Sequence, residues 1–258
     1  MAGDYQDKPV LVTAAAAGIG EATARAFAAQ GARLMLSDIN EEGGQKVAEE
    51  LRSQGVDAHF LRADATNEED IKALVAKTVE TLGGLSVAAN IVGDVVGDAF
   101  GPEFHTQSTE GWNGTIAVSL NSVYLSMKHE IAYMIEHGGG VIANVTSLAA
   151  LLYVPESGAA YAAAKAGVVQ LTKFAALTYA DRGVRANCIA PGVTPTAAYF
   201  KGGEEMGNAV INKLLEGHAI KRLIDPSEQA EAILWLCSDR ASMVTGQVLP
   251  VDGGWTAR

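Results

Sequence analysis

A tyrosine and a lysine stand four residues apart in the segment YAAAK, which runs from Tyr161 to Lys165. In a helix, this spacing places both side chains on one face. A phenol with a pKa of about 10 is a poor acid–base catalyst at neutral pH, and a neighbouring ammonium ion lowers that pKa. The pair could therefore exchange a proton with a substrate oxygen. The same pattern is also typical of a solvent-exposed helix.

A serine precedes this pair by 14 residues. Ser147 lies in the segment NVTSLAA, directly after an apolar run. Its hydroxyl group could hold a carbonyl oxygen while Tyr161 donates a proton. The alternative is an ordinary serine in the turn that ends a strand.

A second kind of chemistry is indicated near the N-terminus. The stretch TAAAAGIG, residues 13–20, follows the apolar run PVLV and opens an alanine-rich helix. Backbone N–H groups at such a turn bind phosphate, although the GxGxxG fingerprint is missing. Asp38 comes 18 residues after Gly20, where an acid would hold the ribose of a dinucleotide. Taken alone, Asp38 would suit a helix N-cap or a solvated turn.

Small and polar residues also follow the third and fourth predicted strands. They are Asp64, Asn90, Val92 and Gly93. Ligands of open parallel sheets bind at the carboxyl ends of the strands, so these residues are candidates for the cofactor side. Asp, Asn and Gly also favour turns, which is the alternative explanation.

Short apolar runs alternate with longer helical segments along the whole chain. We predict strands at 10–13, 33–37, 58–62, 85–90, 141–146, 184–190 and 247–251. We predict helices at 19–30, 41–54, 68–82, 112–137, 158–182 and 226–238. This alternation predicts one α/β domain over 1–258, with a parallel sheet covered by helices on both faces. The long connection 194–221 interrupts the pattern and is predicted to be a substrate lid.

Composition excludes several classes of function. The net charge is −11, which argues against nucleic acid and anionic membranes as partners. No run reaches the roughly 18 apolar residues of a membrane span, and the acidic N-terminal segment does not resemble a secretory signal. Two cysteines and five scattered histidines suggest neither a disulfide framework nor a metal site. We expect a soluble cytoplasmic protein without a bound metal.

In this order, the motifs resemble those of the short-chain dehydrogenase/reductase family, over nearly the whole chain. The family's Thr-Gly-x-x-x-Gly-x-Gly pattern corresponds to residues 13–20, and its Asn-Asn-Ala-Gly motif to NIVG at 90–93. The Tyr-x-x-x-Lys pair is intact. The Asn…Pro-Gly stretch appears as NCIAPGVTPT, and the tail VTGQVLPVDGG is similar to the family's C-terminal signature.

The resemblance implies a doubly wound Rossmann domain with a seven-stranded parallel sheet, an NAD cofactor and a homo-oligomer, dimer or tetramer. It implies catalytic roles for Ser147, Tyr161, Lys165 and, in place of the family's asparagine, Ser119. The cofactor-binding residues that it implies are Thr13, Ala15, Gly18, Ile19, Gly20, Asp38, Ile39, Ala63, Asp64, Ala65, Asn90, Val92, Gly93, Tyr161, Lys165, Pro191, Gly192, Val193, Thr194 and Thr196. Asp38 would select NAD over NADP.

Two positions depart from the family's pattern. Ala14 replaces a glycine, which the loop can absorb if the φ angle of Ala14 stays negative. Ser119 stands where the family has the asparagine of its proton relay. We therefore expect an NAD-dependent dehydrogenase or reductase acting on a secondary alcohol or ketone, with an apolar or cyclic substrate. The alternatives are a catalytically weak NAD(H)-binding scaffold and a lyase without net redox chemistry.

Overall fold

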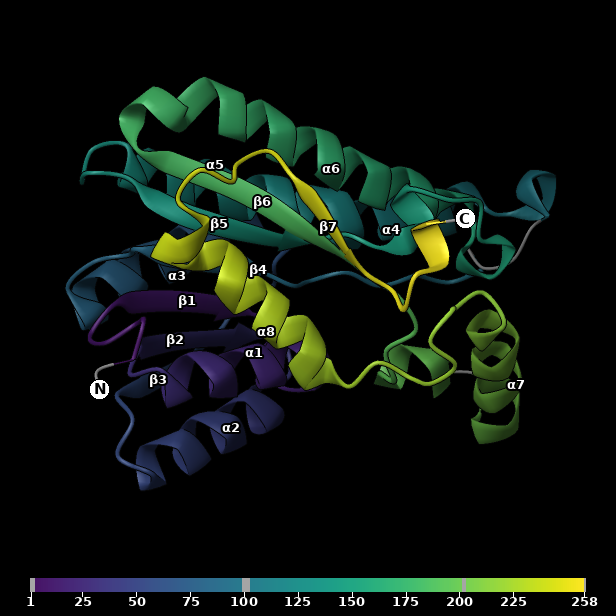
Figure 1. Ribbon diagram of the computed structural model, residues 1–258, viewed down its shortest axis with the longest axis horizontal. Helices are drawn as coiled ribbons and strands as arrows, with labels where there is room; N and C mark the ends of the chain where they lie inside the picture. Colours follow the sequence, from purple (N-terminus) through teal and green to yellow (C-terminus); the bar gives the residue numbers. More distant parts are fainter. Residues whose placement is uncertain (1–2, 99–102, 201–202, 258) are drawn as a thin grey trace.

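The computed structural model describes residues 3–98, 103–200 and 203–257, and a single parallel sheet lies at its centre (Figure 1). The strand order is β3-β2-β1-β4-β5-β6-β7, and every neighbouring pair is parallel. The strands are β1 (Pro9–Thr13), β2 (Arg33–Asp38), β3 (Ala58–Arg62), β4 (Val87–Asn90), β5 (Gly140–Val145), β6 (Val184–Pro191) and β7 (Val248–Val251). The predicted seven-stranded, doubly wound sheet is confirmed.

Two helix layers cover the sheet. The helices are α1 (Gly18–Ala29), α2 (Glu41–Ser53), α3 (Glu68–Leu82), α4 (Thr109–Ile116), α5 (Ser122–Met134), α6 (Ala159–Tyr179), α7 (Glu204–Leu215) and α8 (Pro226–Cys237). One core cluster joins the sheet to α1, α2 and α8, through side chains such as Phe27, Leu51 and Ile233. A second joins the other face to α3, α5 and α6, through side chains such as Leu74 and Met127. Because both faces are covered, the strands need apolar residues at successive positions.

Several helices begin with side-chain caps. Asn40 and Asn67 accept hydrogen bonds from backbone N–H groups in the first turns of α2 and α3. Asp225 and Glu228 form a capping box around Pro226 at the start of α8. These caps fix where the helices begin after β2, after β3 and after the lid.

The predicted helix 112–137 is wrong in its bounds and its continuity. The segment is α4, a π-helical stretch at Ala117–Asn121, and then α5. A π-helical turn adds a residue to the helical repeat, so the apolar spacing in the sequence does not reveal it.

The connection 194–221 contains a short 3₁₀ helix at Ala197–Phe200, followed by α7. Figure 1 shows α7 beyond the carboxyl ends of the strands, apart from the two helix layers. Within the described ranges, no helix is long and apolar enough to cross a membrane.

Candidate active site

A cavity of about 1290 Å³ lies at the carboxyl ends of the central strands. Its walls come from the segments after β1, β4, β5 and β6, from α7 and from the C-terminal tail. The chain runs outward in both directions from β1 and β4, and ligands of open sheets bind at such a switch point. The volume exceeds the roughly 300–1,000 Å³ of a pocket for one small ligand. The cavity therefore has room for a dinucleotide together with a substrate.

Ala14, the first residue after β1, has a φ angle of +52°. The condition under which the loop would absorb this alanine, a negative φ angle, is therefore not met. The chain must turn sharply before α1, and this left-handed conformation costs an alanine roughly 1–2 kcal/mol. The first turn of α1 packs directly against this turn: a Cβ atom on Gly20 would lie 1.8 Å from the Ala14 carbonyl oxygen. Gly20 thus lets α1 pack closely on the turn. Gly18 lines the cavity and has a φ angle of +57°, in the left-handed region that favours glycine.

Asp38 ends β2 and also lines the cavity. Its two carboxylate oxygens accept hydrogen bonds from the backbone N–H groups of Ala16, at 3.0 Å, and Asn40, at 2.9 Å. These bonds orient the carboxylate and leave further lone pairs for a ligand. The geometry therefore fits the predicted contact with ribose hydroxyl groups.

The end of β3 differs from the end of β2. Asp64 accepts hydrogen bonds from both the backbone N–H and the hydroxyl group of Thr66. This is turn chemistry, and neither Asp64 nor its neighbours Ala63 and Ala65 line the cavity. Ile39 does not line the cavity either and is 58 % exposed. A role of these four residues toward the adenosine part of a cofactor stays a prediction.

Other predicted cofactor residues support the site from behind. The Thr13 hydroxyl donates to the Ala89 carbonyl oxygen and accepts from the Ile91 N–H, which joins β1 to the end of β4. Ala15 is fully buried. Asn90 is also buried, and its side-chain amide donates to Glu130 and Asn144 rather than facing the cavity. Its direct contact with a cofactor stays a prediction.

The predicted catalytic residues come together on one wall of the cavity. Ser147 follows β5, and Tyr161 and Lys165 lie in the first turns of α6. Lys165 is 1 % exposed, and its ammonium group donates to the Val145 and Val92 carbonyl oxygens at 3.0 and 3.3 Å. Val92 therefore acts here through its backbone. The Lys165 Nζ atom lies 5.7 Å from the centre of the Tyr161 ring.

Gly93 leaves space for the Lys165 ammonium group at the wall of the cavity. A Cβ atom on Gly93 would lie 2.3 Å from the Lys165 Nζ atom. Any larger residue would displace the ammonium group, so the close approach requires glycine. Gly93 and Lys165 both line the cavity.

Burial dominates the proton affinities of this wall. It raises the pKa of the Tyr161 phenol above its ordinary value, while a hydrogen bond with Ser147 lowers it and the nearby Tyr199 and Asp94 raise it further. Burial also lowers the pKa of Lys165 to about 8. The predicted lowering of the Tyr161 pKa by Lys165 is wrong for this arrangement. The physical reason is that the ammonium group is directed at two carbonyl oxygens, so desolvation of the phenol outweighs its effect.

Ser119 lies in the π-helical turn, is fully buried and does not line the cavity. Its hydroxyl group donates to the Asp94 carbonyl oxygen at 2.6 Å and accepts from the Asp94 N–H at 2.9 Å. Ser119 thus fixes the loop after β4 at the residue that follows Gly93. Its side chain faces the same glycine as Lys165, since a Cβ atom on Gly93 would lie 3.6 Å from the Ser119 Oγ atom. The predicted relay role is not tested by these contacts.

Asp94 itself lines the cavity and was missed in the sequence. Its carboxylate acts electrostatically on both Tyr161 and Lys165, raising the pKa of each. The only available signal was its position directly after the glycine of the fourth strand.

The segment after β6 forms the opposite wall. All of its predicted residues line the cavity: Pro191, Gly192, Val193, Thr194 and Thr196. The Val193 N–H donates to the buried His218 ring at 3.1 Å, and the Thr194 hydroxyl accepts from Gln229 at 3.1 Å. These contacts fix the segment to His218 and to α8.

Apolar side chains surround the remaining end of the cavity. The connection 194–221 contributes Tyr199, Phe200, Met206, Val210 and Leu214, and the rest of the chain contributes Leu148, Val154 and Trp255. Nearby, Ile211 packs in the apolar cluster beneath this end of the cavity. Leu151, Leu152, Tyr153 and Leu215 do not line it. Val154 and Trp255 were missed, because nothing near them in the sequence marks a binding site.

One ion pair links the lid to the body across the mouth of this end. Lys213 of α7 lies 2.7 Å from Glu156, which follows β5, and both residues line the cavity. The pair lowers the pKa of Glu156 and raises that of Lys213, against the desolvation of each. Within the described residues, no cluster of three or more His, Cys, Asp or Glu side chains could hold a metal ion.

Comparisons with known proteins agree with this geometry. A family model of the short-chain dehydrogenase/reductase group, described as enoyl-(acyl carrier protein) reductase, matches residues 13–256. A cyclohexanol dehydrogenase of Acinetobacter sp. (strain SE19) is 40 % identical over 260 residues, covering 100 % of this chain and 98 % of its own.

Two further relatives cover the chain almost completely. A 2,5-dichloro-2,5-cyclohexadiene-1,4-diol dehydrogenase of Sphingobium indicum is 37 % identical, over 99 % of each chain. The crystal structure of levodione reductase superimposes with a TM-score of 0.92 at 28 % identity, over 98 % of this chain and 99 % of that one.

Proposed function

Because this chain belongs to the short-chain dehydrogenase/reductase family, we propose that it is an NAD-dependent dehydrogenase of cyclic secondary alcohols. One observation carries the proposal: Ser147, Tyr161 and Lys165 line the same cavity as Asp38, with an apolar end beyond them. The cavity is thus suited to hold a dinucleotide along the strand ends and a substrate beneath the lid.

Tyr161, Ser147 and Lys165 have separate roles in the proposed reaction. A bound nicotinamide would supply the hydride acceptor. The Tyr161 oxygen takes the proton from the substrate hydroxyl, and the Ser147 hydroxyl donates to the oxygen that becomes a carbonyl. Lys165 would hold the ribose and add positive charge 5.7 Å from the phenol ring. Since burial raises the pKa of Tyr161, oxidation should accelerate as the pH rises into the alkaline range.

The choice of NAD rests on Asp38. The carboxylate is fixed by two backbone N–H groups and would accept hydrogen bonds from the 2′- and 3′-hydroxyl groups of the ribose. A 2′-phosphate at the same place would be repelled by the negative charge. The fit of the loop to the diphosphate is supported by Gly18, which leaves the backbone open toward the cavity.

The choice of a cyclic substrate rests on the apolar end and on the relatives. Leu148, Val154, Leu214 and Trp255 offer apolar surface beside the ion pair of Lys213 and Glu156. The relatives with the names given above act on six-membered carbon rings. A ring alcohol satisfies both the shape of the cavity and the chemistry of the wall.

We also propose that the chain acts as one domain, with 194–221 as a lid that closes over the substrate. The ion pair between Lys213 and Glu156 supports a closed position of α7. A homo-oligomer is supported by apolar side chains on the outer face of α6, where Phe174 is 70 % and Leu177 82 % exposed. Light scattering of the purified protein tests this point, and the cytoplasmic location stays a prediction.

The test of the function is NADH formation from NAD with a panel of alcohols at mildly alkaline pH. The panel contains cyclohexanol, linear secondary alcohols and sugars, with NADP assayed in parallel. We expect turnover of cyclohexanol with NAD and a much lower kcat/KM for the linear alcohols. NADH binding without turnover of any alcohol or ketone would instead support the scaffold alternative and contradict the proposal.

A further inference from the structure

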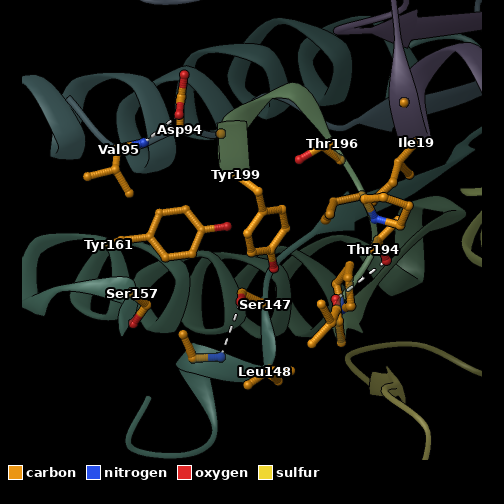
Figure 2. A pocket seen from close by; sticks show the side chains of 18 of the residues that line it. Ile19, Asp94, Val95, Ser147, Leu148, Ser157, Tyr161, Thr194, Thr196 and Tyr199 are labelled. Carbon is orange, nitrogen blue, oxygen red and sulfur yellow. Dashed lines mark hydrogen bonds between the residues drawn. The ribbon is translucent and has the colours of Figure 1, made fainter. Parts of the chain in front are cut away.

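Three hydroxyl groups meet at the reacting end of the cavity (Figure 2). They belong to Ser147, Tyr161 and Tyr199. Figure 2 shows the Tyr199 ring beside the Tyr161 hydroxyl, with its own hydroxyl directed toward Ser147. The two phenols are close enough that Tyr199 raises the pKa of Tyr161.

One reacting oxygen does not use all three groups. A carbonyl oxygen has two lone pairs, and the proposed mechanism fills them with Ser147 and Tyr161. The Tyr199 hydroxyl makes no hydrogen bond with any residue in the described part of the chain. When a ligand fills the cavity and displaces water, a donor without an acceptor destabilises the complex. The third hydroxyl therefore calls for an acceptor on the ligand.

Tyr199 is also held in place. Its backbone N–H donates to the Thr196 carbonyl oxygen at 3.2 Å. Gly207 of α7 packs against its carbonyl group so closely that a Cβ atom there would lie 2.7 Å from that oxygen. The ring packs against the apolar cluster that contains Val193 and Leu214. Burial raises the pKa of this phenol to about 12, so it remains a hydrogen-bond donor in the assay range.

The neighbouring polar side chains have partners already. The Ser157 hydroxyl donates to the Val154 carbonyl oxygen at 2.8 Å, and Thr194 is engaged by Gln229. Glu156 is paired with Lys213. Compared with these side chains, Tyr199 has a hydroxyl group that is still available to a substrate oxygen.

We propose that Tyr199 binds a second oxygen of the substrate, on the ring carbon next to the reacting carbon. The substrates preferred by the enzyme would then be cyclic vicinal diols, oxidised to the corresponding hydroxyketones. The reacting C–H gives its hydride to NAD and the reacting hydroxyl gives its proton to Tyr161, while the second hydroxyl stays unchanged. A vicinal position follows from the arrangement in Figure 2, where the Tyr199 ring lies beside the Tyr161 hydroxyl and the Tyr199 hydroxyl is directed toward Ser147. This inference rests on the proposed function.

The test compares three substrates with NAD: cyclohexanol, 1,2-cyclohexanediol and 1,4-cyclohexanediol, the diols as separate cis and trans isomers. The enzymes are the natural sequence, Tyr199→Phe and Tyr153→Phe. Tyr153 is a matched control, since it is 82 % exposed and does not line the cavity. We expect kcat/KM per hydroxyl group to be about tenfold higher for one 1,2-diol than for cyclohexanol, the size of one hydrogen bond.

Tyr199→Phe should reduce this ratio to near one, whereas Tyr153→Phe should keep it. Phenylalanine fills the same space, and thermal unfolding of the variant checks that the lid still packs. A ratio that Tyr199→Phe leaves unchanged would overturn the inference, and so would a preference for the 1,4-diol that this variant abolishes. Absence of turnover with every alcohol would overturn the proposed function and this inference with it.

Discussion

The two ends of the cavity are built in different ways. The end near β1 and β2 is shaped by backbone: the left-handed turn at Ala14, the open glycine at Gly18 and two N–H groups that orient Asp38. The end under the lid is shaped by side chains from distant parts of the chain, such as Leu148, Tyr199 and Trp255. A short motif can specify the first end, whereas only the packing of the whole fold specifies the second.

This difference bears on how each end can change. The backbone-built end allows few substitutions, because a Cβ atom at Gly20 would lie 1.8 Å from the Ala14 carbonyl oxygen. The side-chain end can exchange one apolar residue for another and so accept a different ring. Relatives that share a cofactor loop can therefore differ in substrate, which is why substrate claims here depend on particular side chains.

The largest effect that we expect concerns the backbone-built end. Asp38→Ser should lower the ratio of kcat/KM for NAD to that for NADP by about 10³-fold. The variant loses charge-assisted hydrogen bonds to the ribose, worth about 1.5–3 kcal/mol each, and it removes the repulsion of a 2′-phosphate. Asp64→Ser is the matched control, because its carboxylate is used in the turn after β3. An equal change in both variants would contradict the role given to Asp38.

The next effect concerns the buried wall behind both ends. Glu130 is fully buried, and burial raises its pKa to about 7 despite the hydrogen bond from Asn90. The unfolded chain binds this proton more weakly than the folded protein does. The stabilisation from protonated Glu130 is therefore fully present below about pH 4.5 and is lost as the pH rises through 7. Relative to Glu130→Gln, the natural protein should lose about 3 kcal/mol of unfolding free energy between pH 4.5 and 8.

Urea unfolding of both proteins across this pH range measures the difference. Because the two chains share every other titrating group, their difference isolates Glu130. A difference that stays constant with pH would show that the carboxyl is already ionised in the folded protein, and Asn90 would then need a different account.

A smaller effect tests the turn at Ala14. Ala14→Gly should stabilise the protein by about 1 kcal/mol, because glycine adopts the observed φ angle without the strain of a Cβ atom. For a chain of this length, that corresponds to a rise of about 2 °C in Tm. Ala15→Gly, at the next position, lacks this gain and should destabilise. A loss of stability in Ala14→Gly would mean that the turn is not left-handed.

The smallest effect concerns the lid. Lys213→Ala removes the ion pair with Glu156, in which Lys213 is 69 % exposed, so the free energy of unfolding should hardly change. If the pair holds the lid closed, KM for the ring alcohol should still rise by a few fold. Lys72→Ala removes a lysine of similar exposure, 62 %, from its pair with Glu69 on α3 and should leave KM unchanged. Equal KM values for the two variants would show that the pair does not act on the substrate.

Sequence reasoning predicted the strands and four of its six helices to within about two residues, because alternation of apolar runs and helical segments is a local pattern. It also placed Ser147, Tyr161 and Asp38 at one cavity. It failed where the outcome depends on tertiary contacts. Neither the conformation of Ala14 nor the π-helical turn at Ser119 has a local signal.

The proton affinities failed for a related reason. The spacing of Tyr161 and Lys165 predicted their proximity correctly, but the spacing does not show what else surrounds them. The carbonyl oxygens of Val92 and Val145 take the ammonium group, and burial then sets the direction of both pKa shifts. Asp64 and Asn90 show the same limit. Both lie at strand ends, as Asp38 does, but Asp64 bonds within a turn and Asn90 within a buried network.

The central claim is that the Tyr161 hydroxyl carries the proton in an NAD-dependent oxidation, and Tyr161→Phe tests it most directly. Two quantities should be measured on the same preparation: turnover of cyclohexanol with NAD, and the Kd for NADH by fluorescence. The account predicts a loss of at least 10³-fold in kcat with a Kd for NADH within about threefold of the natural protein. Retained turnover, or a lost affinity for NADH, would contradict it.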